Sequence, residues 1–335
     1  MSPAVAFSVL AAGTERLDRF LADQLSLSRT QAGRLIAAGR VRIGVDIARA
    51  SRLLSRGDEV RVAFPEPEPP RTIAPLDIPL AVVYQDDALL VIDKPAGLVV
   101  HPAPGHWDDT LVNVLSSRGH GPAGGPEGRA GIVHRLDRDT SGLMVVARSE
   151  EAHRRLGAAL AARRVQRRYA ALTWGHFDPP RTMIDAPIGR HGADRKRMTV
   201  TPKGRTARTD VEVVARFEVV DLLRLTLHSG RTHQIRVHLD HAGHPVVGDP
   251  VYHGGGSRRI SGAARRDAEL IERAAPRQAL HAAELAFRHP SSGQPLRFRS
   301  EWPTDLRQVL EAAAGSHVAG ANPLAYLGFF AESHG

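Results

Sequence analysis

A proline-rich segment about a fifth of the way along the chain constrains its architecture most strongly. Residues 64–79 read FPEPEPPRTIAPLDIP. Proline fixes φ and has no backbone N–H, so this composition favours an extended linker over a helix or an interior strand. The 335 residues are also sufficient for two domains. We therefore expect a small domain over residues 15–63, a linker over 64–79, a large domain over 80–312 and a C-terminal tail over 313–335.

The small domain carries the patterns of two helices followed by short strands. Apolar residues between Leu17 and Leu25 recur at helical spacing, and Ser28 is placed to cap a second helix that ends at Gly39. The stretches VRIG and DEVRVAF then read as strands. We expect a compact α/β module.

Basic side chains are segregated within this module. The acids gather on the first helix, whereas four arginines lie on the second helix and the strand after it, namely Arg29, Arg34, Arg40 and Arg42. A charged helix face that is merely solvated is the ordinary explanation of such a run. The segregation of the two signs favours instead an electrostatic footprint for RNA.

The charge of the whole chain also indicates an anionic partner. The formal net charge is +9, and only Lys94, Lys196 and Lys203 are lysines among 45 basic residues. Arginine binds phosphate in a bidentate manner and stacks on bases. A GC-rich genome would produce the same preference for arginine without any functional meaning, so the bias alone does not choose between these origins.

Several classes of protein are excluded or disfavoured. The chain has no cysteine, which excludes disulfides, thiol catalysis and cysteine-bound zinc. It has no run of 18 apolar residues and no basic segment before its short N-terminal apolar stretch. We therefore expect a cytoplasmic protein with no membrane partner.

The large domain contains an unusual cluster of charge beside an apolar strand. Residues 131–142 read GIVHRLDRDTSG, and LMVVA follows directly. Charged groups next to a core strand are costly to desolvate unless they are paired or used. A solvated turn is the simpler explanation of this stretch taken alone.

Three further stretches change that balance: DKPAGLVVHP at 93–102, RRYAALTWG at 167–175 and GRTHQIRVH at 230–238. Thr232 could cap a helix that starts at His233. The histidines of this region suggest a metal site, but only His238 and His241 could share a helix face. We expect no metal there and a basic helix that partly faces RNA. The Gly/Pro-rich residues 119–131 are expected to form a loop.

Residues 15–62 resemble an S4-type RNA-binding domain, and the motifs of the large domain, in this order, resemble the RluA-type pseudouridine synthases. The pairing with an S4 domain resembles the RluD branch in particular, and the RluC branch next. The resemblance implies an α+β catalytic domain built on a central, mostly antiparallel sheet. It covers residues 15 to about 305.

The resemblance also implies the site residues. HRLDxxTSG places the nucleophilic aspartate of the family at Asp137, the strand motif places the active-site tyrosine at Tyr169, and GRxHQIRxH places the basic partner of the aspartate at Arg236. Arg135 resembles the arginine that flips the base, and Arg231 belongs to the RNA-binding set. Asp139 and Thr140 are expected to shape the turn.

These assignments fit the chemistry of converting uridine to pseudouridine, which breaks the C1′–N1 bond and joins C1′ to C5. A carboxylate can attack C1′ or assist departure of uracil, and the sequence does not choose between these routes. A fixed cation would keep the carboxylate ionised, and a tyrosine ring offers a stacking face. No metal, redox group or other cofactor is expected.

The resemblance implies a uridine in large-subunit (23S) ribosomal RNA as the substrate, and we expect a monomeric enzyme. Two alternatives stay open. One is a ribosome-assembly factor that binds ribosomal RNA through its S4 module without catalysis, and the other is a pseudouridine synthase that acts on tRNA.

Overall fold

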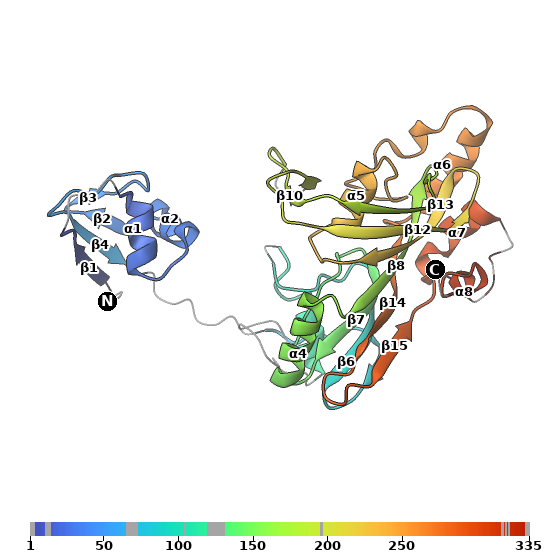
Figure 1. The fold of residues 1–335 in the computed structure, drawn as a ribbon, viewed down its shortest axis with the longest axis horizontal. Coiled ribbons are helices and arrows are strands. Elements are labelled where there is room, and N and C mark those ends of the chain that lie inside the picture. Colours follow the sequence, from blue (N-terminus) through green and yellow to red (C-terminus); the bar gives the residue numbers. More distant parts are fainter. Residues whose placement is uncertain are drawn as a thin grey trace. The chain divides into compact units, whose positions relative to one another are not determined.

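The computed structural model divides into two compact units, residues 1–72 and 73–335, each described here by itself (Figure 1). The described residues are 4–10, 15–64, 73–103, 105–118, 131–194, 197–315, 318, 320 and 322–331. Residues 65–72 of the predicted linker and 119–130 of the predicted loop lie outside them.

The N-terminal unit packs two helices against a four-stranded antiparallel sheet of order β1-β4-β2-β3. Its elements are α1 (Leu17–Gln24), α2 (Arg29–Ala37), β1 (Ala4–Ser8), β2 (Val41–Ile43), β3 (Asp46–Ile47) and β4 (Glu59–Ala63). Leu17, Leu21, Val60 and Val62 are fully buried in its core. Strand β1 precedes residue 15, so the predicted start of this module omitted an edge strand.

The second helix begins where the sequence predicts. The Ser28 hydroxyl accepts a hydrogen bond from the Gln31 backbone N–H at 3.2 Å, and the Gln31 side chain accepts one from the Ser28 N–H at 2.8 Å. This reciprocal pair satisfies two donors that the first helical turn would otherwise leave free. Gly39 follows the helix with φ of +68°, a conformation that favours glycine.

The C-terminal unit is built on a nine-stranded sheet. The order is β5-β6-β7-β14-β8-β13-β12-β9, with β15 also paired to β14. The strands are β5 (Ala81–Gln85), β6 (Leu89–Lys94), β7 (Ser141–Ala147), β8 (Gln166–Trp174), β9 (Arg181–Asp185), β12 (Arg208–Arg216), β13 (Val220–Leu227), β14 (Leu280–Arg288) and β15 (Pro295–Arg299). Strands β7 and β14 run parallel and the other pairs are antiparallel, which confirms the expected mostly antiparallel sheet.

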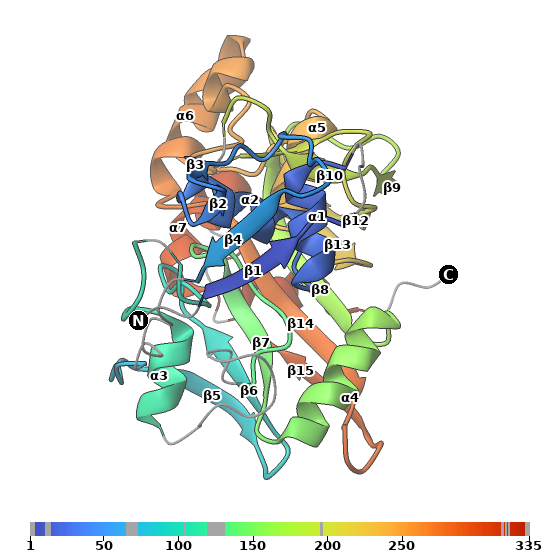
Figure 2. The same ribbon diagram turned by 90° about the vertical axis from the view of Figure 1, so that its left-hand side faces the viewer.

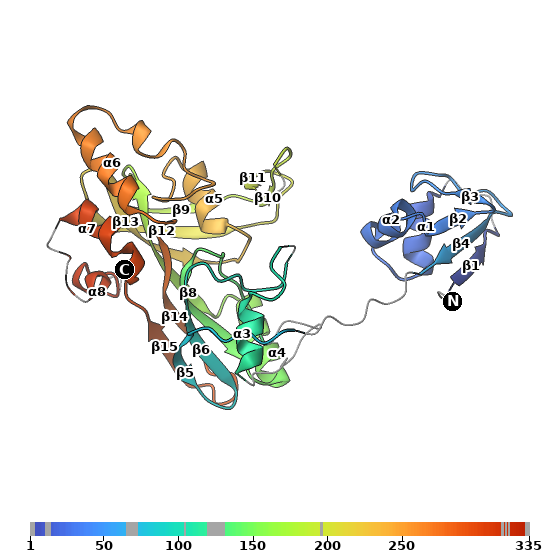
Figure 3. The same ribbon diagram turned by 180° about the vertical axis from the view of Figure 1, so that it is seen from behind.

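Helices cover both faces of this sheet. Helix α3 (Leu111–Ser117) packs on Leu90 and Ile92, whereas α4 (Glu150–Ala161) packs on the alternate residues Leu89 and Val91, so the two lie on opposite faces of β6 (Figure 2). The other end carries α5 (Gln234–His241), α6 (Arg265–Ala274), α7 (Arg307–Ala314) and α8 (Pro323–Tyr326), seen from behind in Figure 3. A small hairpin joins β10 (Ile188–Arg190) to β11 (Met198–Val200).

The limits of the large domain differ from the predicted ones at both ends. Asn113 donates to the Ala74 carbonyl at 2.8 Å and its own carbonyl accepts from Leu76 N–H, so residues 73–79 of the predicted linker belong to this unit. Leu324 and Phe329 are buried in its main core, so the predicted tail folds back onto it. The sequence of the tail gave no periodic pattern long enough to indicate this packing.

No helix in the part of the chain that the structure describes is long and apolar enough to cross a membrane.

Candidate active site

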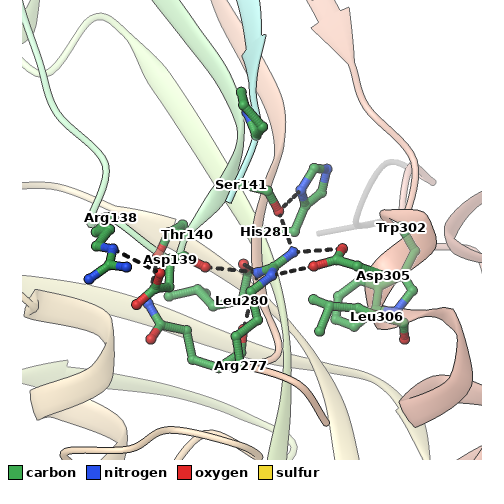
Figure 4. A network of polar contacts seen from close by, with 12 residues as sticks. Arg138, Asp139, Thr140, Ser141, Arg277, Leu280, His281, Trp302, Asp305 and Leu306 are labelled. Carbon is green, nitrogen blue, oxygen red and sulfur yellow. Dashed lines mark hydrogen bonds and ion pairs between the residues drawn. The ribbon is translucent and has the colours of Figure 1, made fainter. Parts of the chain in front are cut away.

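The charged cluster that precedes β7 forms a tight turn. The Thr140 backbone N–H donates to the Asp137 carbonyl at 3.1 Å, which closes the turn Asp137–Thr140. Arg277, three residues before β14, anchors this turn: it donates to the Asp139 carbonyl and to the Ser141 hydroxyl, each at 2.9 Å (Figure 4). Asp305 holds the other side of the same guanidinium, at 2.6 Å from Nε. Asp139 and Thr140 thus lie in the turn, as the sequence indicated.

A buried lysine, Lys94, binds the backbone of the turn Asp137–Thr140. Lys94 is fully buried at the end of β6, and its Nζ donates to the carbonyls of Pro95, Leu98 and Arg138 at 2.7, 3.0 and 3.0 Å. Burial, and then the charge of Arg277, lower the pKa of Lys94 to about 7. The sequence analysis singled out DKPAGLVVHP but assigned Lys94 no role, because only the fold brings the Arg138 carbonyl to it.

Arg236 lies between two carboxylates. Its Nη1 is 3.2 Å from Asp137 Oδ2, while Nε and Nη2 form a bidentate pair with Asp249 at 2.6 and 2.8 Å. Burial alone would lower the pKa of Arg236, but the hydrogen bonds and charges of Asp249 and Asp137 raise it above its ordinary value. The guanidinium is therefore fixed and charged beside Asp137.

Asp249 is the member of this group that the sequence analysis missed. Its Oδ1 also accepts from the Val251 and Tyr252 backbone N–H groups at 2.8 and 2.9 Å. Burial alone would raise the pKa of Asp249. The contacts with Arg236 and these N–H groups outweigh burial, so the pKa lies below its ordinary value. The signal available was the stretch GDPVY at 248–252, an acid within an otherwise apolar sequence.

The start of α5 differs from the prediction. The helix begins at Gln234 after His233, which has φ of +56°, and Thr232 makes no capping hydrogen bond. The Gln234 side chain takes over part of that role: its Oε1 accepts from Ser229 Oγ at 2.8 Å and from Arg231 N–H at 3.1 Å. A left-handed conformation at a non-glycine residue is strained, and here it lies at the wall of the site.

Tyr169 shares a small cavity with Asp137 and Arg236. The cavity measures about 50 Å³, and all three side chains line it. Tyr169 projects from β8, is 4% exposed, and burial is the main cause that raises its pKa. The three predicted catalytic residues come from a turn, a strand and a helix that are far apart in sequence, and the fold brings them to one cavity.

A larger cavity of about 680 Å³ adjoins the small one and is strongly basic. Its arginines are Arg135, Arg163, Arg167, Arg208 and Arg231, and Asp185 is its one acid among the described lining residues. Arg135, Arg167, Gly230 and Arg231 line both cavities, so they lie at the junction. The predicted RNA-binding residues Arg135 and Arg231 therefore lie beside Asp137.

Helix α5, predicted to face RNA in part, is buried over residues 234–239. His238 is fully buried, with Nδ1 2.9 Å from Thr209 Oγ1 and Nε2 2.9 Å from the Ala186 carbonyl. The helix packs residues 234–239 into the protein because it must carry Arg236 inward to the carboxylates. Within the described residues there is no group of three or more side chains suited to hold a metal ion.

The four predicted arginines of the N-terminal unit lie in the other unit of the chain. Arg34, Arg40 and Arg42 are exposed. Arg29 is exposed but forms an ion pair with Asp18 at 2.9 Å, and hydrogen bonds from Arg16 and then Arg29 lower the pKa of Asp18 to about 2. One of the four charges is thus partly neutralised within the unit.

Comparison with protein families gives two matches. Residues 88–241 match the RNA pseudouridylate synthase family, and residues 15–60 match the S4 domain.

Individual proteins give the same picture. The chain is 44% identical over 311 residues to a protein of Pseudomonas aeruginosa named ribosomal large subunit pseudouridine synthase D. The match covers 90% of this chain and 95% of that protein. It is 49% identical over 298 residues to an uncharacterised RNA pseudouridine synthase of Chloroflexus aurantiacus, with 88% and 89% covered. Among solved structures, human RNA pseudouridylate synthase domain containing 1 matches with a TM-score of 0.52 and 27% identity, over 69% of this chain and 87% of that one.

Proposed function

This chain belongs to the RNA pseudouridylate synthase family, and from that membership we propose that it isomerises specific uridines of large-subunit ribosomal RNA to pseudouridine with Asp137 as the catalytic carboxylate. The relatives from Pseudomonas aeruginosa and Xanthomonas campestris are both named as large-subunit enzymes. The observation that carries the assignment of the site is the ion pair of 3.2 Å between Asp137 and Arg236, next to Tyr169 in one cavity.

In the proposed reaction the Asp137 carboxylate acts at the sugar of the target nucleotide. Arg236 donates a hydrogen bond to Asp137 and orients it, and Asp249 in turn holds Arg236 in place. A carboxylate in this setting can attack C1′ directly, or take up a proton from the sugar after uracil departs. Both routes require the same charged Asp137.

Tyr169 provides a surface for the base as it turns between bond breaking and bond making. Tyr169 lines the cavity that holds Asp137, and in this proposal its ring stacks on uracil. Reaching this cavity requires the uridine to leave its stack, which costs a few kcal/mol. Arg135, exposed at the junction of the two cavities, is placed to occupy the vacated position.

The N-terminal unit supplies further affinity for RNA in this proposal, through the exposed Arg34, Arg40 and Arg42. The protein is proposed to act as a monomer, in the cytoplasm where ribosomal RNA is made. It needs no cofactor, since the isomerisation involves no redox change and no transfer of phosphate.

The test compares Asp137→Asn with Asp139→Asn. The first change removes the carboxylate charge at nearly constant size, so we expect no detectable pseudouridine, with RNA affinity retained because binding rests on arginines. Asp139 contributes mainly its backbone carbonyl to the turn, through Arg277, so its variant should keep most of the activity. Pseudouridine is mapped in 23S RNA from cells that lack the gene and carry each variant.

A non-catalytic assembly factor would leave pseudouridine unchanged in both variants and in the deletion strain. A synthase that acts on tRNA would instead change the tRNA map and leave 23S RNA unaltered. Abolition by Asp139→Asn alone would show that the other carboxylate of the turn is the catalytic one.

A further inference from the structure

Arg167 is a nearly buried cation without a counter-charge. It lies on β8 two residues before Tyr169, so strand alternation puts both side chains on the same face of the sheet. The residue is 9% exposed, and its Nε is buried without a hydrogen-bond partner. Among the described residues no carboxylate lies within ion-pair distance of its guanidinium, and no other group forms a hydrogen bond with it.

The adjacent arginine, whose Nε also lacks a hydrogen-bond partner, shows what a cation with a counter-charge looks like at this strand. Arg168 points to the opposite face, where Glu284 lies 3.0 Å from its Nη1. Buried charges are normally paired in this way because an isolated ion loses its hydration without compensation. Arg167 therefore stands out as a group whose partner is supplied from outside the folded chain.

The side chains around Arg167 do not supply negative charge. His134, which faces the same cavity, is neutral at physiological pH because burial, and then the charge of Arg167, lower its pKa to about 3. Asp137 is already engaged by Arg236. The remaining charged neighbours at the junction, Arg135 and Arg231, are cations as well.

The position of Arg167 points to the identity of the missing anion. It lines both the small cavity that holds Asp137 and the large basic cavity. A methyl group at Gly230 would lie 3.2 Å from Arg167 Nη1, so the absence of a side chain there leaves room at the end of the guanidinium. An anion at this point would lie where the chain of a bound nucleotide passes from one cavity to the other.

We propose that Arg167 binds a phosphodiester group next to the target uridine, and so fixes the position of the flipped nucleotide over Asp137. This inference rests on the proposed function, which supplies the RNA. The planar guanidinium suits the two non-bridging oxygens of a phosphate. Arg167 is on this view a positioning residue, because its effect on the reaction passes through the placement of the sugar.

The experiment uses the full chain and a fragment of 23S RNA in which the wild-type protein forms pseudouridine. Two variants are compared: Arg167→Met, and Arg164→Met as a matched control, an exposed arginine three residues upstream that lines neither cavity. Each protein is given the natural fragment and fragments with one neutral methylphosphonate, either 5′ or 3′ of the target. Single-turnover rates and RNA affinities are measured.

One of the two methylphosphonates should weaken wild type and Arg164→Met, by about ten- to a hundredfold in single-turnover rate or in RNA affinity. This is the size expected for the loss of one charge-assisted contact. Arg167→Met should show a comparable loss with natural RNA and no further loss with that methylphosphonate. The slope of affinity against salt should also be less steep by about one phosphate contact.

A second measurement, thermal unfolding of the free protein, tests the inference without RNA. Because Arg167 is unpaired in the free protein, Arg167→Met should raise the midpoint of thermal unfolding, whereas Arg164→Met should leave it unchanged. A lower midpoint for Arg167→Met, together with the full methylphosphonate effect, would show that Arg167 has a structural role and would overturn the proposal.

The two levels of inference fail separately. If wild type forms pseudouridine but Arg167→Met responds to every methylphosphonate as wild type does, the phosphate assignment is wrong and the proposed function stands. If wild type forms no pseudouridine in 23S RNA, the proposed function is wrong, and the thermal midpoint of Arg167→Met still decides whether this arginine is an unsatisfied cation.

Discussion

At the scale of residues, the site depends on one arginine shared by two carboxylates with different surroundings. Asp249 is fully buried and is held by two backbone N–H groups as well as by Arg236. The side chain of Asp137 is 16% exposed, and among the residues that the structure describes its one polar contact is the 3.2 Å contact with Nη1 of Arg236. Asp249 therefore holds the arginine in place, which leaves the carboxylate of Asp137 open to the cavity.

This division of roles predicts different effects on stability for two conservative substitutions. Asp249→Asn leaves a buried Arg236 without its bidentate partner, so we expect a loss of about 3 kcal/mol or more in the free energy of unfolding. Asp137→Asn leaves that bidentate pair intact and removes one of two carboxylates around a single cation, so stability should be unchanged or slightly higher. Urea unfolding of both variants at pH 7 measures the difference.

Equal losses in the two variants would show that the carboxylates contribute equally to holding Arg236. Activity serves as the complementary reading, since Asp137→Asn should be inactive although stable, and Asp249→Asn should lose activity because Arg236 is no longer held in place.

At the scale of elements, a directed chain of hydrogen bonds ties the turn before β7 to β14, β15 and β6. Ser300 Oγ donates to Asp93, so it accepts from His281 Nε2 at 3.0 Å. The lowered pKa of His281 keeps it neutral, so its Nδ1 accepts from Ser141 Oγ at 2.9 Å, and Ser141 Oγ in turn accepts from Arg277 (Figure 4). His281 therefore carries its proton on Nε2.

The neutral His281 in this series of hydrogen bonds predicts that the protein loses stability in acid. Burial, and then the charge of Arg277, lower the pKa of His281 to about 3, whereas the unfolded chain has the ordinary value of about 6.5. Between these values the unfolded state binds a proton that the folded state does not, so stability falls as the pH falls from about 6.5 towards 3. The expected slope is about 1.4 kcal/mol per pH unit for this histidine.

His281→Gln removes the titrating imidazole. The free energy of unfolding of this variant should therefore fall less steeply with decreasing pH than that of wild type, by up to about 1.4 kcal/mol per pH unit. The buried His134 contributes in the same direction to both proteins and cancels in the comparison. Free energies of unfolding measured in urea from pH 7 down to pH 4 provide the test, and parallel profiles would show that His281 does not titrate differently in the two states.

At the scale of the whole molecule, the chain consists of two compact units, each with its own hydrophobic core. The N-terminal unit carries the exposed arginines of the S4 domain, and the C-terminal unit carries all the residues of the candidate active site. The residues proposed for the chemistry thus lie in the C-terminal unit together with the basic cavity, and the exposed arginines of the N-terminal unit are proposed to add affinity for RNA.

Removal of residues 1–72 should therefore leave a folded C-terminal unit that binds RNA more weakly and with a less steep dependence on salt, because several phosphate contacts leave with the arginines. Circular dichroism and thermal unfolding check the fold, and affinities from 50 to 200 mM salt check the binding. An unchanged affinity and salt slope would contradict the RNA-binding role assigned to the N-terminal unit. Failure of the truncated protein to fold would contradict the independence of the two cores.

The sequence by itself determined much of this protein. The helix cap at Ser28, the strands in VRIG and DEVRVAF, the apolar strand after Gly142 and the division into two units all follow from local patterns. These features depend on residues close together in the chain, where alternation and capping act directly. The motifs around Asp137, Tyr169 and Arg236 also carried the resemblance to the family.

Only the tertiary structure decided which of these groups meet and which stand alone. Lys94 binds a carbonyl 44 residues away, and the Arg236 side chain spans Asp137, 99 residues before it, and Asp249. The packing of the tail, the burial of His238 and the isolation of Arg167 could not be predicted either, because a side chain has the same local sequence whether its partner is water, a carboxylate or nothing. The strength and cost of a charge depend on what surrounds it in space, and that is set when distant segments pack together.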